Sequence, residues 1–252
     1  MSRTLLILST VVCLLAAGAA VATAASLVGT PGDDTLSAAA GEDLFGEAGD
    51  DTLSAPASGG YVEGGAGDDA LTGGAGPDLL LGGTGDDRVD GAAGDDAIYA
   101  GPGIDAVLGG PGADAIWTQG GDDRVFAGGG RDTVRVAGGA VFVDAGSGRD
   151  RVWAADGSGT LLGRGGADVI VAVDGPYSVR GGPGRDRIRT GDFADRVSGG
   201  PGPDGIATGG GDDVLDLRDG VRDRAYCGAG DDTVYADPFD LLRDCETVAA
   251  VR

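Results

Sequence analysis

The sequence predicts an all-β protein built as a solenoid of short stacked repeats, and three observations support this. A nine-residue pattern, G-G-x-G-x-D-x-U-x with U a large aliphatic residue, runs without insertion from Gly46 to Asp216 as nineteen successive units. Each unit has one such aliphatic residue, and a unit this small cannot bury it alone, so stability must come from stacking. In a strand, side chains point to alternate faces, so the two neighbours of the aliphatic residue would point outward while it points to a buried face.

The counts at each position show that chance does not hold this frame. Position 8 is Leu, Val or Ile in all 19 units, position 4 is Gly in 17, and position 6 is Asp in 15. Glycine suits positions where the backbone takes a positive φ or closely approaches an ion. We therefore expect position 8 to form the core and positions 7 and 9 to point outward.

The repeat divides the chain into four parts. Residues 1–24 precede it, and residues 25–45 are an irregular N-terminal lead-in that holds one good unit, GTPGDDTLS, and one shortened unit, AAAGEDLF. Residues 46–216 are the nineteen in-frame units. Residues 217–252 are a degenerate C-terminal repeat in which the frame loosens and recovers in CGAGDDTVY. This leaves no room for a separate catalytic domain.

The first 24 residues have the pattern of a Sec signal peptide. Arg3 is followed by the apolar run Leu5 to Val21 and by Ala22-Thr23-Ala24, a small-x-small cleavage site. A membrane anchor is a weaker interpretation, because Ala and Gly dominate the second half of the run and no charged stop-transfer segment follows. We expect a secreted, extracellular protein with no transmembrane anchor after cleavage.

Composition excludes several classes of function. The chain has 53 Gly, 10 Pro and a net charge of -23, which by itself resembles a disordered chain. Loss of Arg3 on cleavage leaves 17 Arg against 41 acids, a net charge of -24, so nucleic acid is not an expected partner. Histidine, the commonest general base, is absent. Acids outnumber arginines 20 to 2 in residues 25–130 and 21 to 15 in residues 131–252.

The repeat resembles the hemolysin-type calcium-binding repeat, the RTX nonapeptide. The resemblance implies a parallel β-roll, a β-helix-like solenoid in which G-G-x-G-x-D forms a turn, x-U-x forms a short strand and two units complete one coil. It also implies Ca²⁺ between stacked turns, each ion taking backbone carbonyls and one Asp from each turn. The alternative is that these Asp residues only solvate the turns, which 15 in-frame copies disfavour.

Alternate units fall on opposite edges of such a roll, so the predicted metal ligands form two files. The first file is Asp51, Asp69, Asp87, Asp105, Asp123, Asp195 and Asp213, interrupted by Val141, Gly159 and Tyr177. The second is Asp78, Asp96, Asp114, Asp132, Asp150, Asp168, Asp186 and Asp204. If each ion needs two stacked Asp residues, the chain binds up to about 12 calcium ions. We expect calcium to neutralise the turns and so to drive or stabilise folding.

Cys227 and Cys245 are expected to form a disulfide that closes the C-terminal cap. Their separation equals two nonapeptide units, one full coil, which would bring them within disulfide reach if the frame persists. A secreted protein favours the bonded form over two free thiols.

Position 9 of alternate units predicts an external ladder. Tyr99, Trp117, Arg135 and Trp153 follow one another at steps of one coil and would stack on the outer face. Such a ladder is a possible site for an extracellular polysaccharide or a surface protein, with Arg135 between the two Trp faces. A self-packed strip that only stiffens its strands is the competing interpretation.

These observations predict a secreted calcium-binding β-roll protein with a structural or adhesive role and no enzymatic activity. The first alternative is a calcium-dependent carbohydrate-binding or cell-wall-binding module that uses the ladder. A remnant of an RTX enzyme is less favoured, because a repeat position explains almost every Asp. An ice-binding roll is also disfavoured, because Asn is absent and Thr occupies position 3 in frame only at Thr84.

Overall fold

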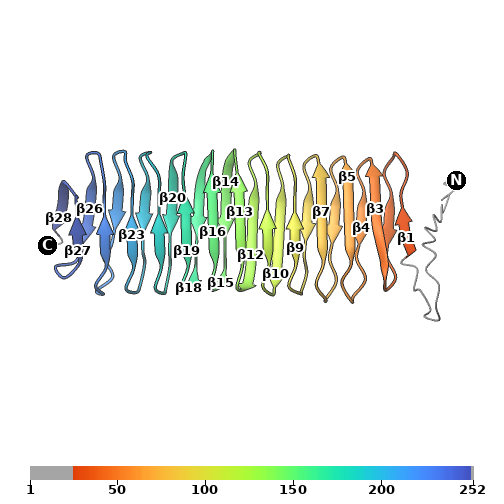
Figure 1. The fold of residues 1–252 in the computed structure, drawn as a ribbon, viewed down its shortest axis with the longest axis horizontal. Coiled ribbons are helices and arrows are strands. Elements are labelled where there is room, and N and C mark those ends of the chain that lie inside the picture. The colour runs from red at the N-terminus through yellow and green to blue at the C-terminus, as the bar shows by residue number, and fades with distance from the viewer. Residues whose placement is uncertain (1–24, 251–252) are drawn as a thin grey trace, which may run out of the picture.

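The computed structural model describes residues 25–250 as one parallel β-roll, which confirms the predicted fold class. Its strands lie side by side along a single long axis, with the N-terminal strand at one end and the C-terminal strands at the other (Figure 1). Residues 1–24, which hold the predicted signal peptide, lie outside the described residues. No helix occurs from residue 25 to residue 250, so this part of the chain contains no helical membrane span.

Two sheets form the roll, and the chain alternates between them. The first sheet contains β1 (Ala25–Val28), β3 (Glu42–Ala48), β5 (Tyr61–Ala66), β7 (Leu79–Thr84), β9 (Ala97–Tyr99), β11 (Ala115–Trp117), β13 (Thr133–Ala137), β16 (Arg151–Ala155), β19 (Val169–Ala172), β21 (Arg187–Arg189), β23 (Gly205–Ala207), β25 (Arg224–Tyr226) and β27 (Leu241–Arg243).

The second sheet contains β2 (Thr35–Ser37), β4 (Thr52–Ser54), β6 (Ala70–Thr72), β8 (Arg88–Asp90), β10 (Ala106–Pro111), β12 (Arg124–Gly130), β14 (Ala140–Asp144), β15 (Ser147–Gly148), β17 (Ser158–Leu162), β18 (Gly165–Gly166), β20 (Tyr177–Arg180), β22 (Arg196–Ser198), β24 (Val214–Asp216), β26 (Thr233–Ala236) and β28 (Thr247–Ala250). Of these, β15 and β18 are two-residue strands off the main path, where β15 pairs with β12 and β18 pairs with β15.

The pairing register gives the length of each coil. Val107 pairs with Val125, a step of two nonapeptide units, and this step holds from the pair Leu44 and Val62 to the pair Val197 and Leu215. The first step of the second sheet is one residue shorter, because the unit at 38–45 lacks one residue. Near the C-terminus the steps become first longer and then shorter than this, so the coil length varies outside residues 46–216.

The core is a double file of the position 8 side chains. All 19 are buried with at most 3% of their surface exposed, from Leu53 to Leu215. Position 1 contributes a second, smaller layer that the repeat pattern did not predict. Ala100, Ala127 and Ala154 are fully buried there. The space at position 1 is therefore small and is filled by small residues in most units. Each coil therefore buries little apolar surface per residue, and its turns must be stabilised by other means.

Candidate metal centre

The position 6 aspartates lie inside the roll and not on its surface. All 15 that the sequence singled out are buried, with at most 4% of the residue exposed. Each stands at the end of a turn, immediately before the outward residue that opens the next strand, for example Asp69 before β6. Burial of so many carboxylates requires compensating partners.

One oxygen of each carboxylate has a partner one coil away. The backbone N–H of Asp51 donates to Oδ1 of Asp69 at 2.8 Å, and that of Asp132 donates to Oδ1 of Asp150, also at 2.8 Å. The pattern runs through the first file from Asp51 to Asp123 and through the second from Gly60 to Asp204. These bonds fix every side chain in the same orientation and align the carboxylates along both edges.

The second oxygen is orphaned in nearly every case. Among the described residues, Oδ2 is buried without a hydrogen-bond partner in Asp51, Asp69, Asp87, Asp96, Asp105, Asp114, Asp123, Asp132, Asp150, Asp168, Asp186, Asp195, Asp204 and Asp213. Asp78, at the start of its file, differs because its Oδ2 accepts the Gly74 N–H at 2.7 Å. Buried unsatisfied oxygens are rare in proteins, and a regular file of them indicates a missing partner.

Backbone carbonyls approach the same place in the units whose position 1 is glycine. A Cβ added to Gly46 would collide both with Oδ2 of Asp51 and with the carbonyl oxygen of Gly64, so these two oxygens face one small space. The backbone at position 4 also lies close to a carbonyl of the neighbouring coil. A Cβ on Gly67, which has φ +135°, would collide with the Gly49 carbonyl oxygen. Glycine therefore lets carboxylate and carbonyl oxygens converge between successive turns.

The electrostatic state of the metal-free files is unfavourable for charged carboxylates. Burial is the main cause that raises the pKa of Asp69, Asp96 and Asp105 to about 6 and that of Asp87 and Asp114 to about 7, with neighbouring aspartates adding to the rise. The N–H bond to each Oδ1 opposes this effect. Without a cation, the roll therefore favours protonated carboxylates at its turns.

This donor set fits Ca²⁺. The ion prefers oxygen ligands and combines carboxylates with backbone carbonyls. Within residues 25–250, no group of three His, Cys, Asp or Glu side chains is arranged to hold a metal ion by itself, so a site must be completed by backbone oxygens, as the glycine turns allow. The residues that would hold the ions are the two Asp files.

The structure extends both files beyond the residues chosen from the sequence. Asp34, Asp223 and Asp232 join them, since Asp34 N–H donates to Asp51, Asp204 N–H to Asp223, and Asp213 N–H to Asp232. The second file then ends at Asp240 and the first at Glu246. A signal for Asp232 was present in CGAGDDTVY, whereas Asp223 was obscured by the extra residue in 217–226.

The three neighbouring turns of the first edge without Asp, at Val141, Gly159 and Tyr177, have a different construction. Val141 and Tyr177 are buried at position 6, where apolar side chains occupy the place of a carboxylate. The strands there, β14, β17 and β20, have five, five and four residues, against three in β4, β6 and β8. This part of the first edge is therefore stabilised by strand pairing and apolar packing, without buried charge.

Exposed aspartates at position 5 form further hydrogen-bonded series on both edges of the roll. Oδ1 of Asp50 accepts the N–H of Asp68, and Oδ1 of Asp95 accepts that of Ala113, in the direction opposite to the buried files. These residues are exposed, so solvent satisfies their remaining oxygens. They are hydrogen-bonding partners of the turns and differ from position 6 chiefly in burial.

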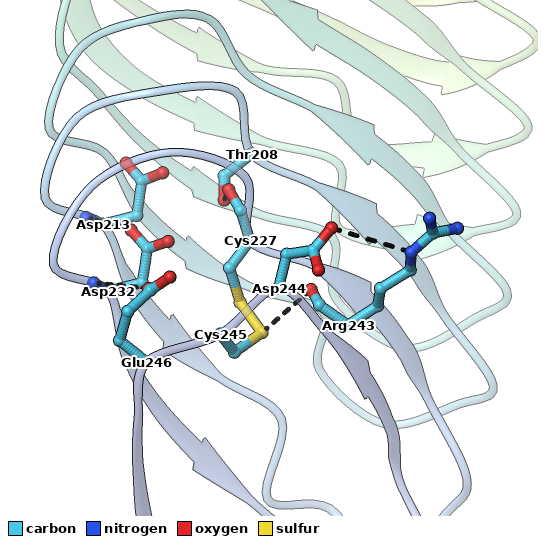
Figure 2. The surroundings of a disulfide bond; sticks show 8 residues. All are labelled: Thr208, Asp213, Cys227, Asp232, Arg243, Asp244, Cys245 and Glu246. Atoms are coloured by element: carbon cyan, nitrogen blue, oxygen red, sulfur yellow. Dashed lines mark hydrogen bonds and ion pairs between the residues drawn. A yellow bond between two sulfur atoms is a disulfide. The ribbon is translucent and has the colours of Figure 1, made fainter.

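The disulfide between Cys227 and Cys245 is present, with the Cα atoms 5.1 Å apart. Figure 2 shows it beside the end of the first file, where Asp213, Asp232 and Glu246 follow one another. The frame does not persist as expected, because Tyr226 pairs with Arg243, one residue short of a full coil. Cys245 therefore stands one residue beyond the exact partner of Cys227, and the bond still forms because the two Cα atoms remain within disulfide reach.

Loss of this disulfide should destabilise the C-terminal coils. A loop of this length contributes about 3 kcal/mol in the chain-entropy treatment, so we expect Cys227→Ser/Cys245→Ser to lower the free energy of unfolding by about that amount. Denaturant unfolding of the calcium-loaded protein, with and without reductant, measures the effect. The double variant should be insensitive to reductant, and an unaltered midpoint for the reduced wild-type chain would contradict a stabilising bond.

The external ladder is formed in part. Tyr99 and Trp117 stack with ring centroids 4.5 Å apart and planes 3° from parallel. Tyr99, Trp117, Arg135 and Trp153 line one hollow of about 260 Å³ on the first sheet. The predicted stacking of Arg135 between the tryptophans is not found, since the cation–π pairs within residues 25–250 are Arg218 with Tyr235 and Arg243 with Tyr226.

Comparison with known proteins shows similarity to a protein family and to a solved structure. The family described as the RTX calcium-binding nonapeptide repeat (4 copies) matches residues 24–53, 63–98, 99–134, 130–161, 144–176 and 180–220. A hyperactive, Ca²⁺-dependent, β-helical antifreeze protein from an Antarctic bacterium is 20% identical, with a TM-score of 0.41 over 82% of this chain and 80% of that chain. Comparison with curated protein sequences found no match.

Proposed function

Because the chain belongs to the family of RTX calcium-binding nonapeptide repeat proteins, we propose that it is a secreted β-roll that calcium holds folded and that serves a structural or adhesive role outside the cell. The observation that carries the proposal is the double file of buried aspartates with orphaned Oδ2 atoms. Their hydrogen bonds already place them one coil apart, so that successive carboxylates can share a cation.

The residues of the chain set the conditions for binding. Oδ1 is held by the backbone, Oδ2 is left available, and position 1 and position 4 glycines let carbonyls approach. Bound calcium supplies the positive charge that ionised, buried carboxylates need. Because the aspartates lie scattered along the unfolded chain, binding and folding are coupled. A low-calcium interior and a calcium-rich exterior would then restrict the folded state to the outside of the cell.

Neighbouring aspartates provide a matched test of where the ions bind. Asp96→Asn retains an acceptor for the Asp78 N–H but removes a buried charge that takes part in two steps of the second file. Asp95→Asn removes one exposed charge from the adjacent residue. In calcium titrations by equilibrium dialysis, we expect the Asp96 variant to bind about two ions fewer than wild type. The Asp95 variant should bind the wild-type number.

Equal stoichiometries for the two variants would show that the buried file does not hold the ions. Circular dichroism of both variants in saturating calcium serves as the control for folding. A loss of sites with an intact strand signal assigns the effect to the ligand, whereas a loss of the strand signal in both variants assigns it to the hydrogen-bond ladders.

A second candidate function has one observation in its favour. The hollow of about 260 Å³ at Tyr99, Trp117, Arg135 and Trp153 puts aromatic faces and a cation on the same outer surface. Exposed aromatic residues of this kind bind sugar rings or protein partners. A calcium-dependent carbohydrate-binding module is therefore the alternative role for the same roll.

A further inference from the structure

The exposed charges of the roll are divided between its faces. The units of the first sheet at 127–135, 145–153, 163–171, 181–189 and 199–207 contain eight Arg and five Asp. All five acids are position 6 aspartates, namely Asp132, Asp150, Asp168, Asp186 and Asp204, and each is at most 3% exposed. The outer surface of these units therefore carries arginine and no acid, in a chain of net charge -23.

The intervening units, which form the opposite edge and the second sheet, carry exposed acids together with three exposed arginines, Arg124, Arg180 and Arg196. Asp122, Asp156, Asp174, Asp192 and Asp212 are exposed in their turns. The acids of this region are thus buried in the files, exposed on the far edge or, for Asp144 and Asp216, paired with Arg164 and Arg218. Calcium binding would neutralise the buried ones and leave the first sheet as a positively charged surface.

We name as the arginine face Arg131, Arg135, Arg149, Arg151, Arg185, Arg187, Arg189 and Arg224, all of which are exposed. None of them makes an ion pair or a side-chain hydrogen bond with another residue between 25 and 250. The neighbouring Arg164 and Arg218, by contrast, pair with Asp144 and Asp216 at 2.7 Å. The arginine face is therefore available to an external anion.

Its spacing is regular. Arg151 pairs in register with Val169 and Val169 with Arg187, and Arg187 pairs with Gly205 and Gly205 with Arg224. Strands stand about 4.8 Å apart, so these arginines recur about every 9.6 Å along the axis. Double-stranded DNA carries a phosphate about every 3.4 Å on each strand, so the face is matched to a polymer of lower charge density.

The surface also has shape. Arg185, Arg187, Arg222 and Arg224 line a hollow of about 370 Å³ that lies over Pro203 and Gly205. Gly205 has no side chain, and a Cβ added there would meet only one atom within 4 Å, at 3.9 Å. Arg135 lies between Trp117 and Trp153 in the pairing register of the same sheet, on the N-terminal side of this hollow. The two tryptophans and Arg135 line the second hollow.

We propose that the arginine face and the adjoining tryptophans bind a linear anionic polysaccharide with one carboxylate per disaccharide, lying along the axis of the roll. Arginines on alternate strands contact successive carboxylates, and Trp117 and Trp153 contact the apolar faces of the sugar rings. The inference rests on the proposed function, because calcium must fold the roll and neutralise the buried aspartates before the face becomes net positive.

Hyaluronan oligosaccharides of defined length provide the probe, with methyl-esterified hyaluronan as the uncharged control. The full chain is titrated in saturating calcium by calorimetry, and its strand signal is recorded in the same samples. We expect binding to hyaluronan that weakens as salt is raised, and at least tenfold weaker binding to the esterified form. Equal binding of the two polymers, or tighter binding of duplex DNA, would overturn the proposal.

Two triple variants make the test specific to the face. Arg151→Gln/Arg187→Gln/Arg224→Gln should weaken hyaluronan binding at least tenfold. Arg88→Gln/Arg124→Gln/Arg196→Gln removes the same charge from position 7 of the second sheet and should stay within twofold of wild type. Equal losses of hyaluronan affinity in the two variants would show that the effect depends only on net charge and would contradict the proposal. A wild-type chain that folds in calcium without binding hyaluronan also sinks it, whereas a chain that does not fold in calcium sinks the calcium proposal instead.

Discussion

Removal of calcium at neutral pH should unfold the roll. In excess chelator at pH 7.5, we expect the strand signal in far-UV circular dichroism to be lost and the radius of gyration from scattering to rise towards about 50 Å, the value for an unfolded chain of this length. Readdition of calcium should reverse both changes. This is the largest effect expected for the protein, because it acts on every turn that contains a buried aspartate.

The physical reason lies in the balance of each coil. One position 8 side chain and one small position 1 residue per unit supply little apolar burial, whereas nearly every Asp-containing turn buries a carboxylate with an orphaned oxygen. Uncompensated burial of charge costs several kcal/mol per group, and a file repeats that cost along the axis. Stacking between neighbouring coils cannot offset it, so the metal-free chain at neutral pH is better solvated as a polyanion.

Magnesium is the matched control for ionic strength and charge. It demands near-octahedral geometry and releases its waters reluctantly, so it should restore far less strand signal than calcium at equal concentration. Retention of the full strand signal in chelator would contradict the coupling between calcium and folding. Retention confined to the region around Val141 and Tyr177, seen by hydrogen exchange, would agree with it, because those turns bury no carboxylate.

The sequence predicted the regular part of the fold because its information is local and repeated. One aliphatic residue in every nonapeptide is sufficient to assign Val107 and Val125 to stacked strands, and the structure pairs them. The same frame placed Asp69 and Asp87 one coil apart, and the Asp69 N–H donates to Asp87. In a solenoid each unit contacts only its neighbours, so periodicity alone determines most contacts.

Contacts that depend on a change of coil length could not be predicted from the nonapeptide period. Asp223 and Asp240 continue the second file through one step that is longer and one that is shorter than two units, and no nonapeptide frame aligns them. The Cys227–Cys245 bond was expected from a step of one full coil, yet the strands beside it pair one residue short of that. The buried alanines of position 1 were missed because alanine alone does not distinguish a packed corner from a solvated turn.

The charge division of the surface was also hidden in the sequence. Arginine counts per half of the chain indicated only that the second half is richer in Arg. Assignment of alternate units to opposite sheets is needed before Arg151, Arg187 and Arg224 fall on one face and Arg124 and Arg196 on the other. This pattern has the period of a coil, twice that of the repeat.

Acid should fold the calcium-free chain. Burial raises the pKa of Asp87, Asp114, Asp150 and Asp204 to about 7 in the folded state, above the value of 3.8 that applies to an exposed Asp. A raised pKa means that the folded state binds protons more tightly than the unfolded state. The contribution of these groups to folding stability is therefore fully present below about pH 4 and is lost as the pH rises through about 7.

In chelator, we expect the strand signal to be weak at pH 7.5 and to grow as the pH is lowered to about 5.5, where the folded state is largely protonated at these positions and the unfolded state is still ionised. Calcium reverses the sign, because protons compete with it for the same oxygens, so calcium affinity should fall over the interval from pH 7.5 to 5.5. Circular dichroism with and without calcium across this range measures both trends.

Two variants separate titration of the buried files from a general effect of net charge. Asp114→Asn makes one buried position 6 group permanently neutral and should shift the chelator transition towards higher pH. Asp95→Asn changes the net charge equally at an exposed position 5 residue and should leave the transition where it is. Equal shifts for both would attribute the acid response to reduced repulsion over the whole chain. A shift for the Asp114 variant alone would attribute the acid response to the buried carboxylates that are proposed to bind calcium. Protons and calcium would then be alternative means of neutralising one set of buried charges.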